Sequence, residues 1–427
     1  MTRTIAPIAT LLLSAAVLLL GNGLQGTLIP IRAQLESYST FEIGILGSSY
    51  FLGFALGCGL GPRTVRRVGH IRAFTAMAAL ASTVALAHAL VTTPMVWVPL
   101  RAITGFCFAV LYIVIESWLN ERATNENRGR ILSLYTIINL TVITLGQMMV
   151  TLHDPESFPL FSVASILVSL AAVPLALTAS PAPEAIPLAR IRLRHLYRIS
   201  PVGFIGCLAV GLANGSFWSL APVYTQDAGM TIAGTALFMS VAVIGGAVGQ
   251  WPLGRISDRM DRRRVIVASC LLSAALGIAL VLAGGLGRPV LLTLVFGFGF
   301  MALPLYSLSV AHTNDYVAPG EFVEASSGLL MIYAAGAVAG PMLASLVMGL
   351  TGQSALFGFI AAVHLLMCLF ALYRMRRRGS VSATDKPDFI AVPGNAPTAY
   401  VLHPAVEEEE RAEAETAVAV PGGSPPS

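Results

Sequence analysis

Long apolar segments separated by short polar segments fill most of this sequence. The run from about Ile232 to Leu253 is an example, because it carries no charged residue and is followed at once by arginines and aspartates. About 20 apolar residues are the length that a helix needs to cross a bilayer. The pattern predicts spans at residues 1–29, 41–61, 71–91, 95–118, 131–152, 158–179, 201–223, 231–252, 264–284, 289–311, 323–349 and 353–373.

Composition supports an all-α integral membrane protein with twelve transmembrane helices. Hydrophobic residues make up 56% of the chain, charged residues 11%, and the mean hydropathy is +0.76. The net charge of +4 averages basic loops with an acidic tail, so it does not predict a nucleic-acid partner. The five cysteines lie in or beside apolar segments, which favours packing over disulfide bonds.

Arginines gather in every second polar segment. One set of segments holds Arg63, Arg66, Arg67, Arg72, Arg122, Arg128, Arg130, Arg190, Arg192, Arg194, Arg198, Arg255, Arg259, Arg262, Arg263, Arg264, Arg374, Arg376, Arg377 and Arg378. The other set holds Arg32 and Arg288. Because cytoplasmic loops carry an excess of basic residues, we expect both termini in the cytoplasm.

The chain contains an internal repeat at an offset of 192 residues. Asn22-Gly23 then falls on Asn214-Gly215, and Gly53 falls on Gly245. The repeat predicts two pseudo-symmetric six-helix bundles, at residues 1–180 and 201–375, joined by a cytoplasmic linker at 181–200. Residues 376–427 are rich in Pro, Gly, Ala and Glu, so we expect a disordered tail with no part in transport.

Several motifs resemble a known family. The segment G-R-I-S-D-R-M-D-R-R at Gly254–Arg263 resembles the loop G-x-x-x-D-R-x-G-R-R of the major facilitator superfamily. V-I-E-S-W-L at 114–119, N-R-G-R at 127–130, L-G-Q at 145–147 and G-Q-W-P-L-G-R at 249–255 resemble, more narrowly, its YcaD-like branch of bacterial facilitators. Two positions depart from the pattern, since Arg66 stands for the aspartate in the first half and Asp261 for the glycine in the second. The resemblance implies the major facilitator fold and alternating access around a midplane site.

Charges of both signs at the cytoplasmic helix ends form a candidate gate. We expect Asp258 and its neighbouring arginines to pair with acidic residues at Asp315, Glu321 or Glu324, and Arg66 and Arg67 to pair with Glu116 or Glu121. The alternative is that these charges serve only to set the orientation of the helices in the membrane. The candidate gate residues are Arg66, Arg67, Arg128, Arg130, Gly254, Asp258, Arg259, Arg262 and Glu324.

Polar side chains within apolar helices mark a candidate substrate site, because each costs free energy in lipid unless it is paired or used. The candidates are Asn22, Gln25, Tyr135, Asn139, Asn214, Trp218, Tyr306 and Tyr333. A packing or helix-bending role is the alternative for Asn22 and Asn214, which begin the repeated Asn-Gly pairs. Glycines four apart, such as Gly53 and Gly57, predict close helix contacts, either static or at a sliding interface between the halves.

Arg101 and Glu116 are the charges in the interior of the predicted spans, and both are candidates for coupling. They lie fifteen residues apart on the fourth helix, about 22 Å along its axis, so they cannot pair. Arg101 begins R-A-I-T-G, which resembles the superfamily motif R-x-x-x-G, whose arginine is implicated in proton or substrate coupling. Snorkelling to the interface is the alternative for Arg101. Glu116 is either a proton carrier or a gate partner.

These features predict a secondary transporter of the bacterial inner membrane that acts as a monomer, without a metal or other cofactor. No acidic residue lies in the middle of the spans at 1–29 and 201–223, so we expect a neutral or anionic small organic substrate, with protons as the candidate coupling ion. Two alternatives stay open: polyspecific efflux of hydrophobic compounds, and a non-transporting sensor or assembly factor on the same scaffold. An enzyme is not expected, because no nucleophile with an adjacent base and no nucleotide-binding loop is evident.

Overall fold

The computed structural model describes residues 8–123, 127–177, 192–283, 285–318, 321–379, 389 and 391. The helices of its first half are α2 (Ala9–Leu35), α3 (Thr40–Val68), α4 (His70–Leu90), α5 (Pro94–Arg122), α6 (Arg128–Met148), η2 (Met149–Thr151), α7 (Pro159–Leu170) and α8 (Ala172–Ala176). The short helix α9 (Leu193–Ile199) follows. The second half holds α10 (Pro201–Asp227), α11 (Ile232–Arg259), α12 (Arg262–Leu282), α13 (Arg288–Ala302), α14 (Leu305–Asn314), α15 (Phe322–Thr351) and α16 (Ala355–Met375).

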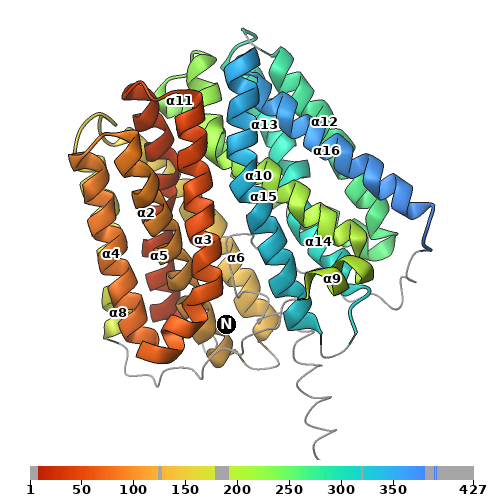
Figure 1. Cartoon of the computed structure of the whole chain (residues 1–427), viewed down its shortest axis with the longest axis horizontal. Coiled ribbons are helices and arrows are strands. Elements are labelled where there is room, and N and C mark those ends of the chain that lie inside the picture. Colours follow the sequence, from red (N-terminus) through yellow and green to blue (C-terminus); the bar gives the residue numbers. More distant parts are fainter. Residues whose placement is uncertain are drawn as a thin grey trace, which may run out of the picture.

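Within the described residues, twelve helical segments are long and apolar enough to span a membrane, which confirms the predicted fold class. The two halves lie side by side, with α3 of the first half next to α15 of the second (Figure 1). Most of the proposed linker, at residues 181–191, lies outside the described residues, and Leu193–Ile199 is helical. The proposed tail also lies outside them, except for residues 376–379, Phe389 and Ala391.

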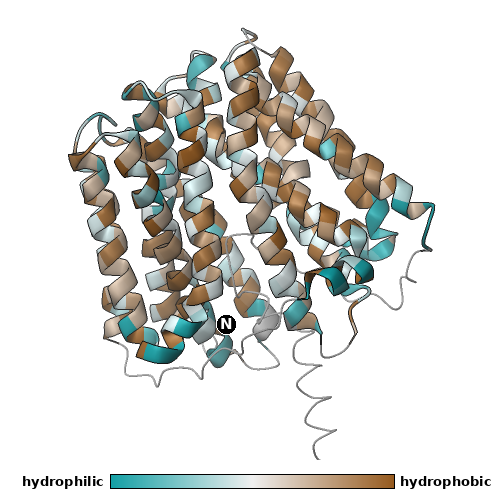
Figure 2. Cartoon of the chain, in the orientation of Figure 1, coloured by the Kyte–Doolittle hydropathy of each residue, from teal (hydrophilic) through white to brown (hydrophobic). Residues whose placement is uncertain are grey.

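Arginines lie at one end of the bundle, where α3, α5, α11 and α16 finish close to Arg66, Arg122, Arg259 and Arg374. We call this the basic end and the opposite one the far end. Apolar residues cover the flanks between them, and hydrophilic residues gather at the basic end, at the bottom of Figure 2. This distribution fits helices that cross hydrocarbon and end in water.

The helices extend beyond the apolar runs from which they were predicted. Helix α11 continues through Gly254 to Arg259, so the expected loop is reduced to Met260 and Asp261. A helix can continue through charged residues once it has left the hydrocarbon. Hydropathy therefore marks the membrane boundary rather than the end of the helix. The tenth span is divided after Ala302, where Pro304 lacks a backbone donor, and hydropathy gives no sign of this break.

Glycine faces hold neighbouring helices together within each half. On α3, Leu52, Leu56 and Leu60 are exposed, whereas the adjacent glycines at 53, 57 and 61 are buried against α5. A Cβ on Gly53 would meet the carbonyl of Ala102, and the repeat-related Gly245 faces the carbonyl of Phe296 on α13 in the same way. These glycines make intra-half contacts, so they serve static packing rather than a sliding interface between the halves.

Replacing a glycine of this face should destabilise the protein. In Gly57→Leu the new Cβ would lie 2.6 Å from the Cβ of Ala109 and 2.8 Å from the carbonyl oxygen of Phe106. Overpacking of this kind costs about 1–3 kcal/mol, so we expect a clearly lower unfolding temperature in detergent. Gly59→Leu is the matched control on the same helix, since no neighbouring atom lies within 4 Å of its Cβ position. Equal unfolding temperatures for the two variants would contradict the packing role.

Candidate substrate-binding site

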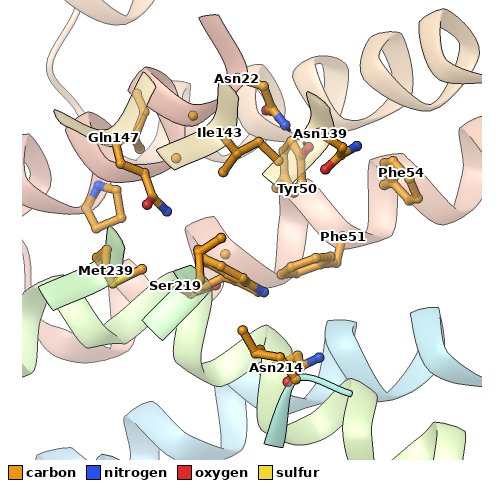
Figure 3. Close-up of a pocket in the computed structure, with 18 of the residues that line it drawn as sticks. Asn22, Tyr50, Phe51, Phe54, Asn139, Ile143, Gln147, Asn214, Ser219 and Met239 are labelled. Carbon is orange, nitrogen blue, oxygen red and sulfur yellow. Dashed lines mark hydrogen bonds between the residues drawn. The ribbon is translucent and has the colours of Figure 1, made fainter. Parts of the chain in front are cut away.

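A cavity of about 230 Å³ lies between the two halves. Asn22, Tyr50 and Asn139 project from one wall, and Asn214 lies on the wall opposite (Figure 3). Its lining residues are Asn22, Gly23, Gly26, Ile29, Pro30, Ile43, Leu46, Gly47, Tyr50, Phe51, Phe54, Arg101, Asn139, Leu140, Ile143, Gln147, Asn214, Trp218, Ser219, Met239, Val243, Gln250, Leu303, Tyr306, Leu330, Tyr333 and Ala334. The volume suits a small organic molecule.

The two halves meet at the far end of the cavity. A Cβ on Gly44 of α3 would overlap the side chain of Ser345 on α15, and one on Gly47 would overlap Ser219 on α10. Gln353 also donates a hydrogen bond to Thr40 across the halves at 2.8 Å. Towards the basic end, helices of the second half slant away from the first (Figure 1). The cavity is therefore closed towards the far end.

Arg101 and Tyr50 are brought together by glycine contacts between α3 and α5. A Cβ on Gly105, four residues after Arg101, would overlap the carbonyl of Tyr50. This close approach sets the Arg101 guanidinium over the Tyr50 ring, 4.5 Å from its centroid. Arg101 is only 8% exposed, and its Nε has no hydrogen-bond partner among the described residues. The guanidinium thus retains hydrogen-bonding capacity beside the cavity.

Asn22 links three helices on the same wall. Its Nδ2 donates to the hydroxyl of Tyr112 on α5 at 2.8 Å, and the Tyr50 hydroxyl donates to its Oδ1 over a long 3.5 Å. Asn22 therefore orients Tyr50, whose ring supports Arg101. The asparagine has a structural role as well as a place in the lining.

The opposite wall is built from α10, α11, α14 and α15. A Cβ on Gly211 would overlap the carbonyl of Tyr333. The backbones of α10 and α15 are therefore in contact about one turn from Asn214, which lines the cavity. Tyr333 packs edge-on against Tyr306 with ring centroids 4.9 Å apart. Trp218 lines the cavity one turn from Asn214.

Charge in the lining is confined to Arg101 among the described residues. The remaining polar groups of the lining belong to amide, hydroxyl and indole side chains. Phe51, Phe54 and Met239 are among the residues that form its apolar surface. None of the described lining residues is acidic, so they offer no counter-charge to a cation. The wall favours a molecule with an apolar body and a neutral or negatively charged polar group.

Most of the predicted site residues come together at this cavity. Asn22, Asn139, Asn214, Trp218, Tyr306 and Tyr333 line it, as does Arg101, which was predicted for coupling. Gln25 does not line the cavity; it is 1% exposed, and its amide atoms have no partner among the described residues. Tyr135 is fully buried away from the lining and donates to Glu116 at 3.1 Å.

The cavity is also lined by four residues that the sequence pattern did not indicate, Tyr50, Phe51, Phe54 and Gln250. Aromatic residues on an apolar helix do not distinguish a cavity from lipid or core. The spacing of Tyr50 and Phe54, one helical turn apart and next to the Gly53 face, was the available signal.

The second-half gate residues pair within their own half. The fully buried Arg262 side chain donates to Asp315 at 3.0 Å and to Asp258 at 2.8 Å, and so joins α11, α12 and the end of α14. Asp261 caps α12 and bonds Arg263. Burial alone would raise the pKa of Asp261, but the hydrogen bonds and charge of Arg263 outweigh burial and lower that pKa.

Most of the other gate candidates lie at exposed positions. Arg66, Arg67, Arg130 and Arg259 are exposed, and Arg128 begins α6. Glu324 pairs with Arg192 at 2.7 Å, which fastens α9 to α15. Glu116 is 1% exposed on α5. Within the described residues, no group of histidine, cysteine and acidic side chains is arranged to hold a metal ion.

Within the described residues, twelve apolar helices in two related halves surround a central cavity, an arrangement typical of membrane transporters. The family model of the Major Facilitator Superfamily matches residues 11–310, and the chain belongs to this superfamily. This membership points to a role in transport, and the apolar helices of the described residues point to a multi-pass membrane protein.

Similar proteins place the chain more narrowly. An uncharacterized MFS-type transporter of Enterobacter sp. (strain 638) is 28% identical over 86% of this chain and 95% of its own length. The uncharacterized MFS-type transporter YcaD of Escherichia fergusonii is 27% identical over 87% of this chain and 96% of its own. The solved nucleoside transporter NupG has a similar fold, with a TM-score of 0.74 and 14% identity over 87% of this chain and 99% of that one. These similarities confirm the predicted YcaD-like resemblance.

Crowding the contact at Gly44 should open the far end. In Gly44→Leu the added side chain would overlap Ser345 and the carbonyl of Pro341. Because such overlap costs about 1–3 kcal/mol, the far-open population should rise about fivefold or more. The measurement is the rate at which an impermeant maleimide, added from the far side of sealed vesicles, labels Ser219→Cys.

Gly349→Leu is the matched control for this variant. Gly349 lies near the far end of α15 and has no neighbouring atom within 4 Å of its Cβ position. Labelling that rises equally in both variants would show that Gly44 does not close the far end.

Proposed function

We propose that this protein is a secondary transporter that moves a small neutral or singly anionic organic molecule across the bacterial inner membrane by alternating access. The observation that carries the proposal is the cavity, which both halves wall and in which Arg101 is the charged lining residue among those described. The basic end is proposed to face the cytoplasm, which also places both termini there.

The described state corresponds to the inward-open stage of this cycle. Contacts at Gly44, Gly47 and Gln353 join the halves at the far end, which would be periplasmic. Glycine contacts such as Gly53 against Ala102 lie inside one half and need not change during the cycle. Rocking of two rigid halves would then expose the same cavity to either side.

Arg101 is proposed to orient the substrate through an anionic or acceptor group. A buried guanidinium such as that of Arg101 interacts more strongly with a carboxylate than it would in bulk water. The aromatic rings of Tyr50, Phe51 and Phe54 lie along the same wall and would contact an apolar body. An organic monocarboxylate satisfies both features.

Protons are the proposed coupling ion, with Glu116 as the titrating group. Glu116 is a buried acid inside a span, and it accepts a hydrogen bond from the Tyr135 hydroxyl. A buried carboxyl changes charge at an energetic cost, so its protonation can bias one state of the protein.

Polyspecific efflux is the second candidate, because the cavity wall is mainly apolar. In that case neutral hydrophobic compounds would bind as well as carboxylates, and binding would not depend on Arg101.

Removing the Arg101 charge should abolish the preference for anions. In the wild-type protein at neutral pH, we expect benzoate to raise the unfolding temperature more than benzamide, and benzylamine to have no effect. Loss of one partner of a buried charge pair costs about 2–5 kcal/mol, so Arg101→Gln should weaken benzoate binding by about 30-fold or more. Thermal shift titration measures this.

Arg255→Gln provides the control for loss of a positive charge, since Arg255 is exposed and stacks on Trp251 outside the cavity lining. Benzoate binding should be unchanged in this variant. Tighter binding of benzylamine than of benzoate would contradict the anionic substrate class, and equal binding of all three would favour polyspecific efflux.

Neutralising Glu116 should separate accumulation from exchange. In proteoliposomes, Glu116→Gln is expected to lose substrate accumulation driven by a pH gradient by about tenfold or more, while counterflow without a gradient persists. Glu121→Gln, at an exposed position on the same helix, should accumulate substrate like the wild type. Undiminished gradient-driven accumulation in Glu116→Gln would exclude this role.

A further inference from the structure

Phe389, from the segment predicted to be a tail without function, contacts the basic end of α11. Its backbone N–H donates a hydrogen bond to Oδ1 of Asp258 at 3.0 Å. Its ring lies against Gly254, where a Cβ would overlap the ring atoms. The side chain is half-buried and packs against the hydrophobic core. Gly254 thus forms a notch that fits an aromatic side chain.

The start of the tail is fixed at the basic end of α12. Arg263 donates to the carbonyl of Arg378 at 2.7 Å, and Arg378 donates to the carbonyl of Ile199 at 2.7 Å. The Arg378 guanidinium also lies over the Tyr316 ring, 3.9 Å from its centroid. Eleven positions separate Arg378 from Phe389, which can span at most about 40 Å of extended chain. Anchoring at Arg378 therefore keeps Phe389 at a high local concentration near Gly254.

The notch continues the cavity-lining face of α11. Met239, Val243 and Gln250 line the cavity, and Gly254 follows Gln250 by four residues, so it lies one turn further along the same face. Closing the basic end must bring this face of α11 towards the first half. A ring seated on Gly254 lies in the path of that movement.

We propose that Phe389 is an intramolecular latch that holds the transporter open at the basic end by occupying the Gly254–Asp258 notch. The charge-assisted hydrogen bond to Asp258 and the fit of the ring on Gly254 stabilise the open state selectively. The Asp258 carboxylate is otherwise held by Arg262, so the notch exists before the tail docks. The latch rests on the proposed alternating access, and it makes the tail a regulatory element of the transport cycle.

Hydrogen exchange of the full-length protein in nanodiscs, without substrate, tests the latch. In Phe389→Ala the far-open population should rise about fivefold, which corresponds to about 1 kcal/mol. Amide exchange at the far-end contacts, residues 40–50 of α3 and 341–351 of α15, should accelerate by the same factor. Tyr400→Ala, which removes another aromatic residue from the tail sequence, should leave exchange at the wild-type rate.

Gly254→Ala provides a second variant with the tail intact. The added methyl group would displace the ring, so the same far-end acceleration is expected. Wild-type exchange rates in Phe389→Ala would overturn the latch. Acceleration that extends equally to residues 102–109, inside the first half, would also overturn it, because it would report general loosening.

Benzoate binding separates failure of the latch from failure of the proposed function. Benzoate binding with unchanged far-end exchange in Phe389→Ala would remove the latch and leave the transporter proposal standing. Far-end acceleration without benzoate binding would support the latch while rejecting the proposed substrate class.

Discussion

Contact between helix backbones at glycines determines most of what this molecule can do. At Gly53, Gly105 and Gly245 a carbonyl of the neighbouring helix occupies the space that a Cβ would need. Such contacts cannot slide by small steps, because main-chain atoms on both sides would collide. Each half is therefore stiff, and the interface between halves is where large movement is least costly. The contact at Gly105 sets the Arg101 guanidinium over Tyr50. A similar contact at Gly211 holds α10 against Tyr333 of α15.

Charges at the basic end are largely satisfied without the other half. Arg262 is neutralised by Asp258 and Asp315, and Glu324 is paired with Arg192. A buried guanidinium with complete hydrogen bonding stabilises its own surroundings and gains little from a new partner. The ion pairs expected from charge clustering join groups of the same half, so they do not by themselves set how the two halves meet in this state. The close fit of the glycine contacts and the docked Phe389 bear more directly on this state.

Sequence patterns predicted the spans and the repeat because hydrocarbon imposes a long, uniform constraint on composition. They also indicated Arg101, since a charge within a span is rare and has few uses. They could not separate Asn22 from Gln25, three residues apart on one helix, because the difference depends on helix rotation against α5 and α6. The contact between Phe389 and Gly254 was beyond prediction for another reason. A single aromatic residue in a polar, proline-rich segment has no periodicity that hydropathy can detect.

Closure of the far end also determines where the membrane voltage acts. A water-filled cavity carries the electrical potential of the side to which it opens, so the voltage falls mainly across the closed layer around Gly44 and Gly47 rather than across about 30 Å of hydrocarbon. Field lines are focused in that thin layer. If the halves rock as proposed, an anion held at Arg101 passes through most of the voltage without changing its position in the protein. The glycine contact that seals the far end is then also the main electrical insulator of the transporter.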